Sequence, residues 1–153
     1  MSWIRQTLVS VLVVPMFSSA VPAPQRPSAS DLDAVGRISQ QQFRTLHAAG
    51  KVLVVDVRSE PAFDLGHIAR AVNVPLLEIE RHAGALVKQA GSNRIVTYCS
   101  CPYEHTAAVA AFVLAKHGAK SVSALAGGYV DWVMTGGKVE RRGALTSSEG
   151  TGA

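Results

Sequence analysis

The two cysteines of this 153-residue chain, Cys99 and Cys101, lie one residue apart in the stretch Ile95-Val-Thr-Tyr-Cys-Ser-Cys-Pro-Tyr-Glu-His-Thr106. The residues before Cys99 are typical of a buried strand, and those after Glu104 are typical of a helix. At such a junction, backbone N–H groups and the positive end of the helix dipole converge on a thiol, which lowers its pKa and stabilises a thiolate or a persulfide. The spacing therefore predicts a nucleophilic sulfur at an anion-binding turn.

Other uses of the two thiols are less well supported by their spacing. A bridge between Cys99 and Cys101 would close a very small loop, so it would remove little chain entropy and its geometry would be tight. A redox pair stays open as an alternative, in which Cys101 resolves a persulfide or a sulfenic acid on Cys99. Together with His105 the cysteines offer three ligands to a soft metal but no evident fourth, so we predict no metal site.

Strands and helices alternate along the chain. Short apolar runs predict strands over residues 52–55, 71–74, 94–98 and 121–125. Longer stretches with an apolar face predict helices that begin near Ser39, Ser59, Leu76, Glu104 and Gly127.

The alternation of apolar strands with helices predicts an α/β fold, in which helices cover both faces of a parallel sheet. In sheets of this kind the working site lies at the carboxyl ends of the strands. Asp56-Val57-Arg58 and Cys99 each follow a predicted strand directly. We therefore expect these two stretches to share one edge of the sheet.

The motifs, taken in chain order, resemble those of a single-domain rhodanese. The resemblance runs from roughly Ile38 to Val139 and rests on Val54-Val-Asp-Val-Arg58, Gly66-His-Ile68, Asn73-Val-Pro75, Tyr98-Cys99, Leu125-Ala-Gly-Gly128 and Trp132. It implies a five-stranded parallel sheet with helices on both faces and a persulfide on Cys99. A donor such as thiosulfate would load the sulfur, and cyanide or a thiol would remove it, with ping-pong kinetics. The sulfur is carried on the protein, so no cofactor is expected.

The resemblance places the anion-binding loop at Ser100, Cys101, Pro102, Tyr103, Glu104, His105 and Thr106. Up to the Thr106 hydroxyl this loop is two residues longer than the usual rhodanese loop. Pro102 removes one N–H from it, and Glu104 adds a negative charge where an anion would dock. Counted from Cys101, the loop has the usual six residues, which makes Cys101 the alternative nucleophile. We favour Cys99, because it lies directly at the strand end where the dipole argument applies.

Two further functions compete with sulfur transfer. A non-catalytic sulfur carrier or interaction module would keep the scaffold without fast turnover, and Pro102 and Glu104 favour it. Phosphatase or arsenate-reductase chemistry uses a related longer loop, but His105 stands where that chemistry needs an arginine, and an imidazole cannot form the bidentate fork. His105 could instead donate a hydrogen bond to a bound anion.

Asp56 and Arg58 are the supporting residues of the predicted site. Either they contact substrate, or they form an ion pair that fixes the loop after the strand. We favour the second role, because such pairs usually position other groups.

The N-terminal residues predict export. A single positive charge, an apolar run over residues 7–17 and the small residues Ser18 and Ala20 form the pattern of a signal peptide over 1–20. An uncleaved membrane anchor is the alternative, although the run is shorter than the roughly 20 residues that span a bilayer. We expect a linker over 21–35, a rhodanese-like domain over 36–143 and a flexible tail over 144–153.

Export would place the domain in an oxidising compartment, the periplasm, where a thiol reductant protein would have to keep the cysteines reduced. The expected small-molecule partners are a sulfur-containing anion and a thiol or cyanide acceptor. The net charge is only +4, and the basic side chains are scattered without interleaved aromatics, so we predict no nucleic-acid partner. After removal of the signal peptide we expect no stable membrane insertion.

Overall fold

The computed structural model describes residues 26–142. The predicted signal peptide and the predicted tail lie outside this range. Within it, no helix has both the length and the apolar character that crossing a bilayer requires.

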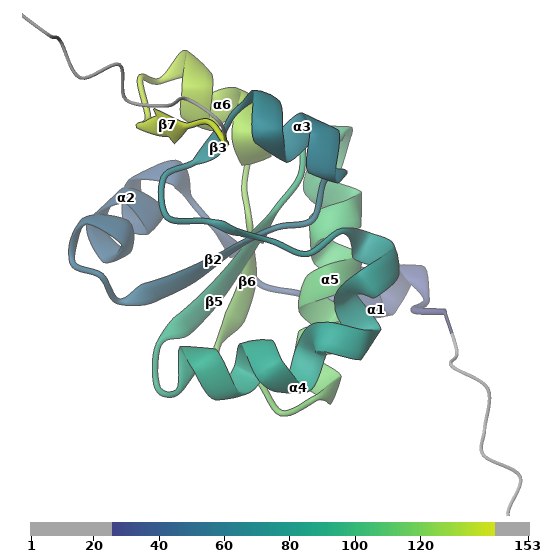
Figure 1. Cartoon of the computed structure of the whole chain (residues 1–153). Helices are drawn as coiled ribbons and strands as arrows, with labels where there is room; N and C mark the ends of the chain where they lie inside the picture. The colour runs from purple at the N-terminus through teal and green to yellow at the C-terminus, as the bar shows by residue number, and fades with distance from the viewer. Residues whose placement is uncertain (1–25, 143–153) are drawn as a thin grey trace, which may run out of the picture.

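A five-stranded parallel sheet forms the centre of the molecule, with the strands in the order β1–β6–β5–β2–β4 (Figure 1). The strands are β1 Arg37–Ile38, β2 Val52–Asp56, β4 Val72–Asn73, β5 Arg94–Tyr98 and β6 Val122–Leu125. A separate antiparallel pair joins β3 His67–Ile68 to β7 Val139–Glu140. The predicted five-stranded parallel sheet is confirmed.

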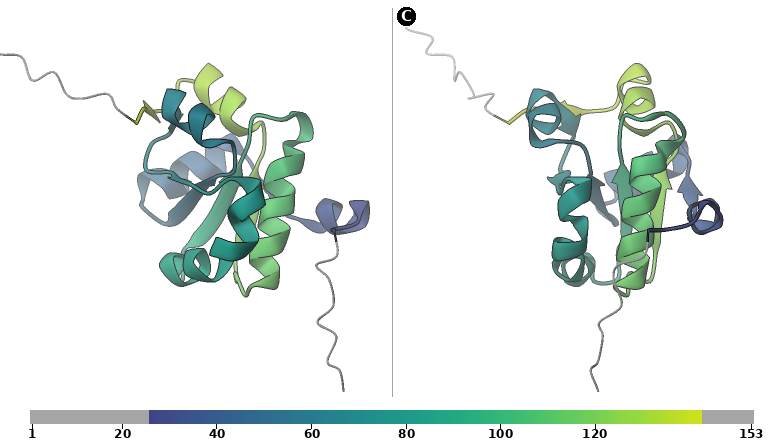
Figure 2. Two further views of the ribbon diagram at one scale, coloured as in Figure 1. Left: turned by 45° about the vertical axis from the view of Figure 1, so that its right-hand side comes forward. Right: turned by 90° about the vertical axis from the view of Figure 1, so that its right-hand side faces the viewer.

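Helices cover both faces of this sheet, as predicted (Figures 1 and 2). One face packs against α2 Gln40–Ala48 and α6 Gly128–Met134, and the other against α4 Ile79–Ala90 and α5 His105–Lys116. The remaining helical segments are α1 Ala29–Ala34, α3 Glu60–Leu65 and the 3₁₀ turns η1 Leu76–Glu78 and η2 Pro102–Glu104.

The two faces carry separate cores because successive strand residues point in opposite directions. Val54 of β2 packs in the cluster that contains Phe43 and Trp132. Its neighbour Val55 packs in the cluster on the other face, which includes Leu114 of α5. This double burial explains why the strands are apolar at nearly every position.

The carboxyl ends of β2, β5 and β6 meet at one edge of the sheet. The β2–β5 register pairs Asp56 with Tyr98, so the residues that follow both strands emerge together. The N–H of Val57 donates to the Tyr98 carbonyl at 3.1 Å, and the N–H of Tyr129 donates to the Cys99 carbonyl at 2.9 Å. The loops after three strands therefore form one hydrogen-bonded surface, and Cys99 lies within it.

One helix lies where we expected only a linker. The Ser28 hydroxyl and the Asp31 carboxylate cap α1 reciprocally, and Leu32 on its inner side is buried. The helix lies beside α5 in both views of Figure 2. Residues 29–34, which we expected to belong to a linker, therefore form a helix that packs against α5.

Candidate functional site

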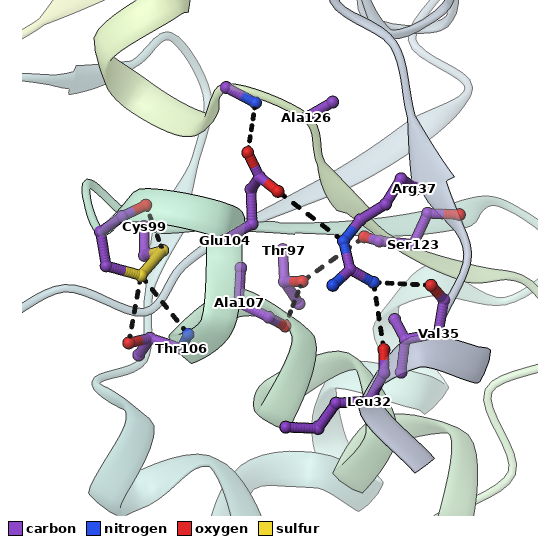
Figure 3. Close-up of polar contacts among 12 residues, drawn as sticks. Leu32, Val35, Arg37, Thr97, Cys99, Glu104, Thr106, Ala107, Ser123 and Ala126 are labelled. Carbon is purple, nitrogen blue, oxygen red and sulfur yellow. Dashed lines mark hydrogen bonds and ion pairs between the residues drawn. A yellow bond between two sulfur atoms is a disulfide. The ribbon is translucent and has the colours of Figure 1, made fainter. Parts of the chain in front are cut away.

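A disulfide joins the two cysteines, whose Cα atoms are 5.7 Å apart (Figure 3). Cys99 is buried, with 3% of its surface exposed, at the point where β5 ends. Cys101 is half-buried. The small loop argues against a structural bridge, but it brings the two sulfurs into the contact that the redox alternative requires.

The helix N-terminus contacts the sulfur of Cys101. The backbone N–H of Thr106, the second residue of α5, lies 3.4 Å from Cys101 Sγ, and the Thr106 hydroxyl lies 3.3 Å from it. The sulfur of Cys99 lies 4.0 Å from the carbonyl oxygen of Cys101. The amide contact that the sequence predicts for Cys99 is therefore found at Cys101, because the lengthened loop carries the second cysteine over the start of α5.

The loop between the cysteines and α5 has a strained backbone. Tyr103 and Glu104 both adopt left-handed conformations, with φ of 59° and 51°. For residues other than glycine this conformation costs about 1–2 kcal/mol each. Such strain is concentrated at functional sites, where surrounding contacts hold it in place. Tyr103 contributes few such contacts, because 88% of the residue's surface is exposed.

Contacts of the Glu104 side chain supply part of that support. Its carboxylate accepts a hydrogen bond from the Gly127 N–H at 2.7 Å and lies 3.8 Å from Arg37 Nε (Figure 3). Arg37 also donates to the carbonyls of Leu32 and Val35, at the end of α1. Glu104 therefore braces the loop between the cysteines and α5 against the loop after β6 and against β1.

We predict that Glu104→Ala destabilises the fold by about 1.5–3 kcal/mol, because it removes a charge-assisted hydrogen bond and leaves the Gly127 N–H without its acceptor. Urea denaturation measures this loss. Glu104→Gln is the matched control, since an amide oxygen can still accept from Gly127, and it should cost clearly less. Equal losses for the two variants would contradict the proposed brace.

A cavity of about 280 Å³ opens beside Cys101. It is lined by Ser100, Cys101, Pro102, Tyr103, Glu104, Gly127, Val130 and Asp131. The structure thus brings five of the predicted loop residues to the cavity, while His105 is exposed at the start of α5 and Thr106 contacts the sulfur from the helix. The lining contains two carboxylates and no lysine or arginine, so the cavity is acidic.

Asp56 and Arg58 form a brace behind this site. Arg58 Nη2 lies 2.6 Å from Asp56 Oδ2, and it also donates to the Gly66 carbonyl at 2.7 Å. The guanidinium stacks on Tyr129, 3.9 Å from the ring centroid. Neither residue lines the cavity, so the geometry supports the positioning role rather than substrate contact.

The charges of this brace affect neighbouring ionisable groups. Burial lowers the pKa of Arg58, but the hydrogen bond and the charge of Asp56 outweigh it, so the net pKa is raised and Arg58 stays protonated. Burial, together with the charge of Asp56, raises the pKa of Tyr98 far above its ordinary value. Tyr98 is therefore neutral, and its hydroxyl accepts the Ile68 N–H at 3.0 Å.

Comparison with known proteins identifies the fold family. The family model described as Rhodanese-like domain matches residues 39–135. The chain belongs to the rhodanese-like domain family.

Three individual proteins are similar to this chain. A helix-turn-helix-type transcriptional regulator of Mycobacterium tuberculosis is 31% identical over 99 residues, which is 65% of this chain and 42% of the regulator. The chain thus spans less than half of that relative. A Bacillus halodurans protein superposes with a TM-score of 0.62 at 27% identity, covering 71% of this chain and 79% of that one. A thiosulfate sulfurtransferase from Pseudomonas aeruginosa gives 0.57 at 30% identity, covering 70% of this chain and 20% of that one.

The turn after β6, which contains Gly127 and Gly128, packs directly on the backbone of Cys99. Gly128 has a φ of 52°, and a Cβ there would overlap the backbone carbonyl oxygen of Cys99. The resemblance includes the Gly127-Gly128 pair among its motifs, but the sequence alone does not explain why glycine is needed there. Asp131, which also lines the cavity, was missed, because a single aspartate on a helix carries no signal for its neighbours in the fold.

Among residues 26–142, no group of three or more His, Cys, Asp and Glu side chains comes close enough to hold an ion.

Proposed function

We propose that this rhodanese-like protein is a sulfurtransferase. It would move a sulfane sulfur from a small donor anion such as thiosulfate to a thiol or to cyanide, through a cysteine persulfide. The observation that carries the proposal is the Cys101 sulfur, held by the first turn of α5 at the wall of an open cavity. The likeness to the Pseudomonas aeruginosa thiosulfate sulfurtransferase supports the same reaction class.

The chemistry follows from what surrounds the sulfur. In the reduced protein, the Thr106 N–H and hydroxyl would stabilise a Cys101 thiolate. This thiolate attacks the sulfane sulfur of thiosulfate, sulfite leaves, and a persulfide remains on Cys101. An acceptor then takes the outer sulfur and restores the thiolate. The assignment to Cys101 replaces the sequence-based preference for Cys99, which lies on the buried side of the pair.

Single-turnover loading tests the proposal. Reduced wild-type protein, Cys99→Ser and Cys101→Ser are each mixed with one equivalent of thiosulfate without air, and the released sulfite is measured. We expect about one sulfite per chain from the wild type and from Cys99→Ser, and none from Cys101→Ser. Release of sulfite by Cys101→Ser but not by Cys99→Ser would show that Cys99 is the nucleophile.

The same experiment distinguishes sulfur transfer from the competing function, a non-catalytic sulfur carrier or interaction module. If none of the three proteins releases sulfite, the sulfurtransferase proposal fails, and the interaction module is favoured. Loading that leaves a stable persulfide, with no release of sulfide and no transfer to cyanide or to any thiol, would favour a sulfur carrier.

The acidic cavity predicts weak use of thiosulfate. Asp131 is exposed and lines the cavity, and at the dielectric constant of water its charge repels a dianion by about 0.5–1 kcal/mol. Asp131→Asn should therefore raise kcat/KM for thiosulfate about two- to fivefold, an effect that shrinks with added salt. Asp33→Asn on α1, which does not line the cavity, is the matched control. An unchanged kcat/KM in Asp131→Asn would show that this charge does not set the donor preference.

A further inference from the structure

The two sulfurs of the pair differ in what they face. Cys101 lines the cavity, so a sulfur delivered from solvent would be added to it on that side. Cys99 is buried in the core cluster beneath α4 and α5, and its sulfur contacts Cys101 Sγ from the interior. The pair is therefore arranged as an outer sulfur that meets the substrate and an inner sulfur directly behind it.

We propose that Cys99 resolves the Cys101 persulfide, so that the sulfur leaves as sulfide and the Cys99–Cys101 disulfide forms. This inference rests on the proposed sulfurtransferase function. The Cys99 thiol loses its proton and attacks Cys101 Sγ, a new bond forms between the two Sγ atoms, and the bond from Cys101 Sγ to the outer sulfur breaks. The outer sulfur departs with the bonding electron pair and becomes hydrosulfide once it holds a proton. No external oxidant takes part.

Position explains why Cys99 attacks the inner sulfur and not the outer one. Its Sγ is already in bonding contact with Cys101 Sγ, whereas the outer sulfur would project away from it, toward the cavity. Displacement at sulfur puts the attacking and leaving groups on opposite sides, which matches an interior thiol and a leaving group in the cavity. Such proximity gives an intramolecular thiol a large advantage over any external acceptor.

The surroundings of the cavity favour departure of the product. Hydrosulfide is an anion, and the carboxylates of Glu104 and Asp131 line the space that it enters. A low-pKa leaving group also speeds the cleavage of the sulfur–sulfur bond. The acidic lining that disfavours a dianionic donor therefore suits the release of sulfide.

The cycle then needs a dithiol. One of its thiolates attacks the more exposed Cys101 sulfur and releases the Cys99 thiolate, and its second thiol displaces Cys101 from the mixed disulfide. The net reaction converts thiosulfate and a dithiol into sulfite, sulfide and an oxidised dithiol. The physiological acceptor class that we infer is a dithiol, with cyanide or single thiols as poor substitutes.

Three quantities measured after one turnover test the inference. Fully reduced protein, freed of reductant, receives one equivalent of thiosulfate without air, and sulfite, sulfide and alkylatable cysteines are counted. The wild type should release about one sulfite and one sulfide per chain and lose both thiols. Cys99→Ser should release the same sulfite but retain the sulfur on Cys101. Addition of dithiothreitol to the spent wild-type protein should restore both thiols.

The outcomes distinguish the two proposals. Sulfite release with a stable wild-type persulfide and no sulfide would overturn the inference and leave the sulfurtransferase function standing. Absence of sulfite from every protein would overturn both. If Cys99→Ser fails to fold, the wild-type sulfide yield and thiol count still test internal resolution. Cys101→Ser then tests its direction, because that variant should release no sulfite if the persulfide forms on Cys101.

Cyanide provides an independent readout. It competes with Cys99 for the persulfide, so removal of Cys99 should raise the thiocyanate yield per turnover at least severalfold. A yield that is unchanged or lower in a folded Cys99→Ser protein would contradict internal resolution.

Discussion

Replacement of Asp56 by asparagine is expected to destabilise the domain by about 3–5 kcal/mol, the range found when one partner of a buried ion pair is removed. Asp56 is fully buried, and the Arg58 side chain is only 10% exposed, so the guanidinium would be left without a counter-charge. The amide of asparagine is similar in shape and keeps one acceptor for the Arg58 N–H, so the loss isolates the charge. Chemical denaturation with an unchanged m-value measures it.

Two controls test whether the lost stability comes from the buried, unpaired charge of Arg58. Asp56→Asn combined with Arg58→Met removes both charges and should recover much of the lost stability. Glu78→Gln breaks the exposed Glu78–Arg81 pair and should change the unfolding free energy by about 0.5 kcal/mol or less. A cost below 1 kcal/mol for Asp56→Asn would show that the pair is not a buried brace.

Activity of the same variant separates positioning from substrate contact. Neither Asp56 nor Arg58 lines the cavity, so Asp56→Asn should keep most of its single-turnover sulfite release at temperatures where it is folded. Loss of loading in the folded variant would instead indicate that this pair contacts the donor.

The central elements of the fold could be predicted because their own residues carry the pattern of a strand or the caps of a helix. The strand over Arg94–Tyr98 has the predicted bounds, since its last four residues are buried and must be apolar or hydrogen-bonded. Helix α2 begins where the reciprocal cap of Ser39 and Gln42 sets it, and α4 ends at Ala90, directly before Gly91, whose φ is 58°. Local chemistry and tertiary packing agree at these positions.

The elements that were missed carry no such local signal. The strands β1, β3 and β7 contain two residues each, so they show no periodicity and exist only through the strands that they pair with. Helix α1 is different, because the cap formed by Ser28 and Asp31 could be seen in the sequence. The neighbouring proline and serine residues gave this segment the composition of a linker.

The candidate site shows the same division. The strand-end position of Cys99 and the helix start after Glu104 follow from the sequence. Which of the two sulfurs contacts the helix does not follow from the sequence. That contact depends on left-handed backbone at Tyr103 and Glu104, and these residue types give no indication of a positive φ. The partner of Glu104 is a backbone N–H 23 residues further along the chain, which only the folded topology brings near.

That topology makes Gly128 the most sensitive glycine at the site. Gly128→Ala is expected to destabilise the domain by about 2–5 kcal/mol, for two separate reasons. The left-handed backbone at this position costs an alanine about 1–2 kcal/mol. The new Cβ would also overlap the Cys99 carbonyl oxygen, and relief of such overpacking costs about 1–3 kcal/mol more.

Gly136→Ala separates the two contributions. Gly136 has a φ of 73°, and a Cβ there would meet nothing within 4 Å, so this variant bears only the conformational cost. The difference in unfolding free energy between the variants therefore measures how closely the turn after β6 presses on Cys99. Because relief of the overlap must move the Cys99 backbone, Gly128→Ala should also lose most of its sulfite release while still folded, and Gly136→Ala should keep it. Equal effects of the two substitutions would mean that Gly128 is needed only for the left-handed backbone of the turn and does not hold Cys99 in place.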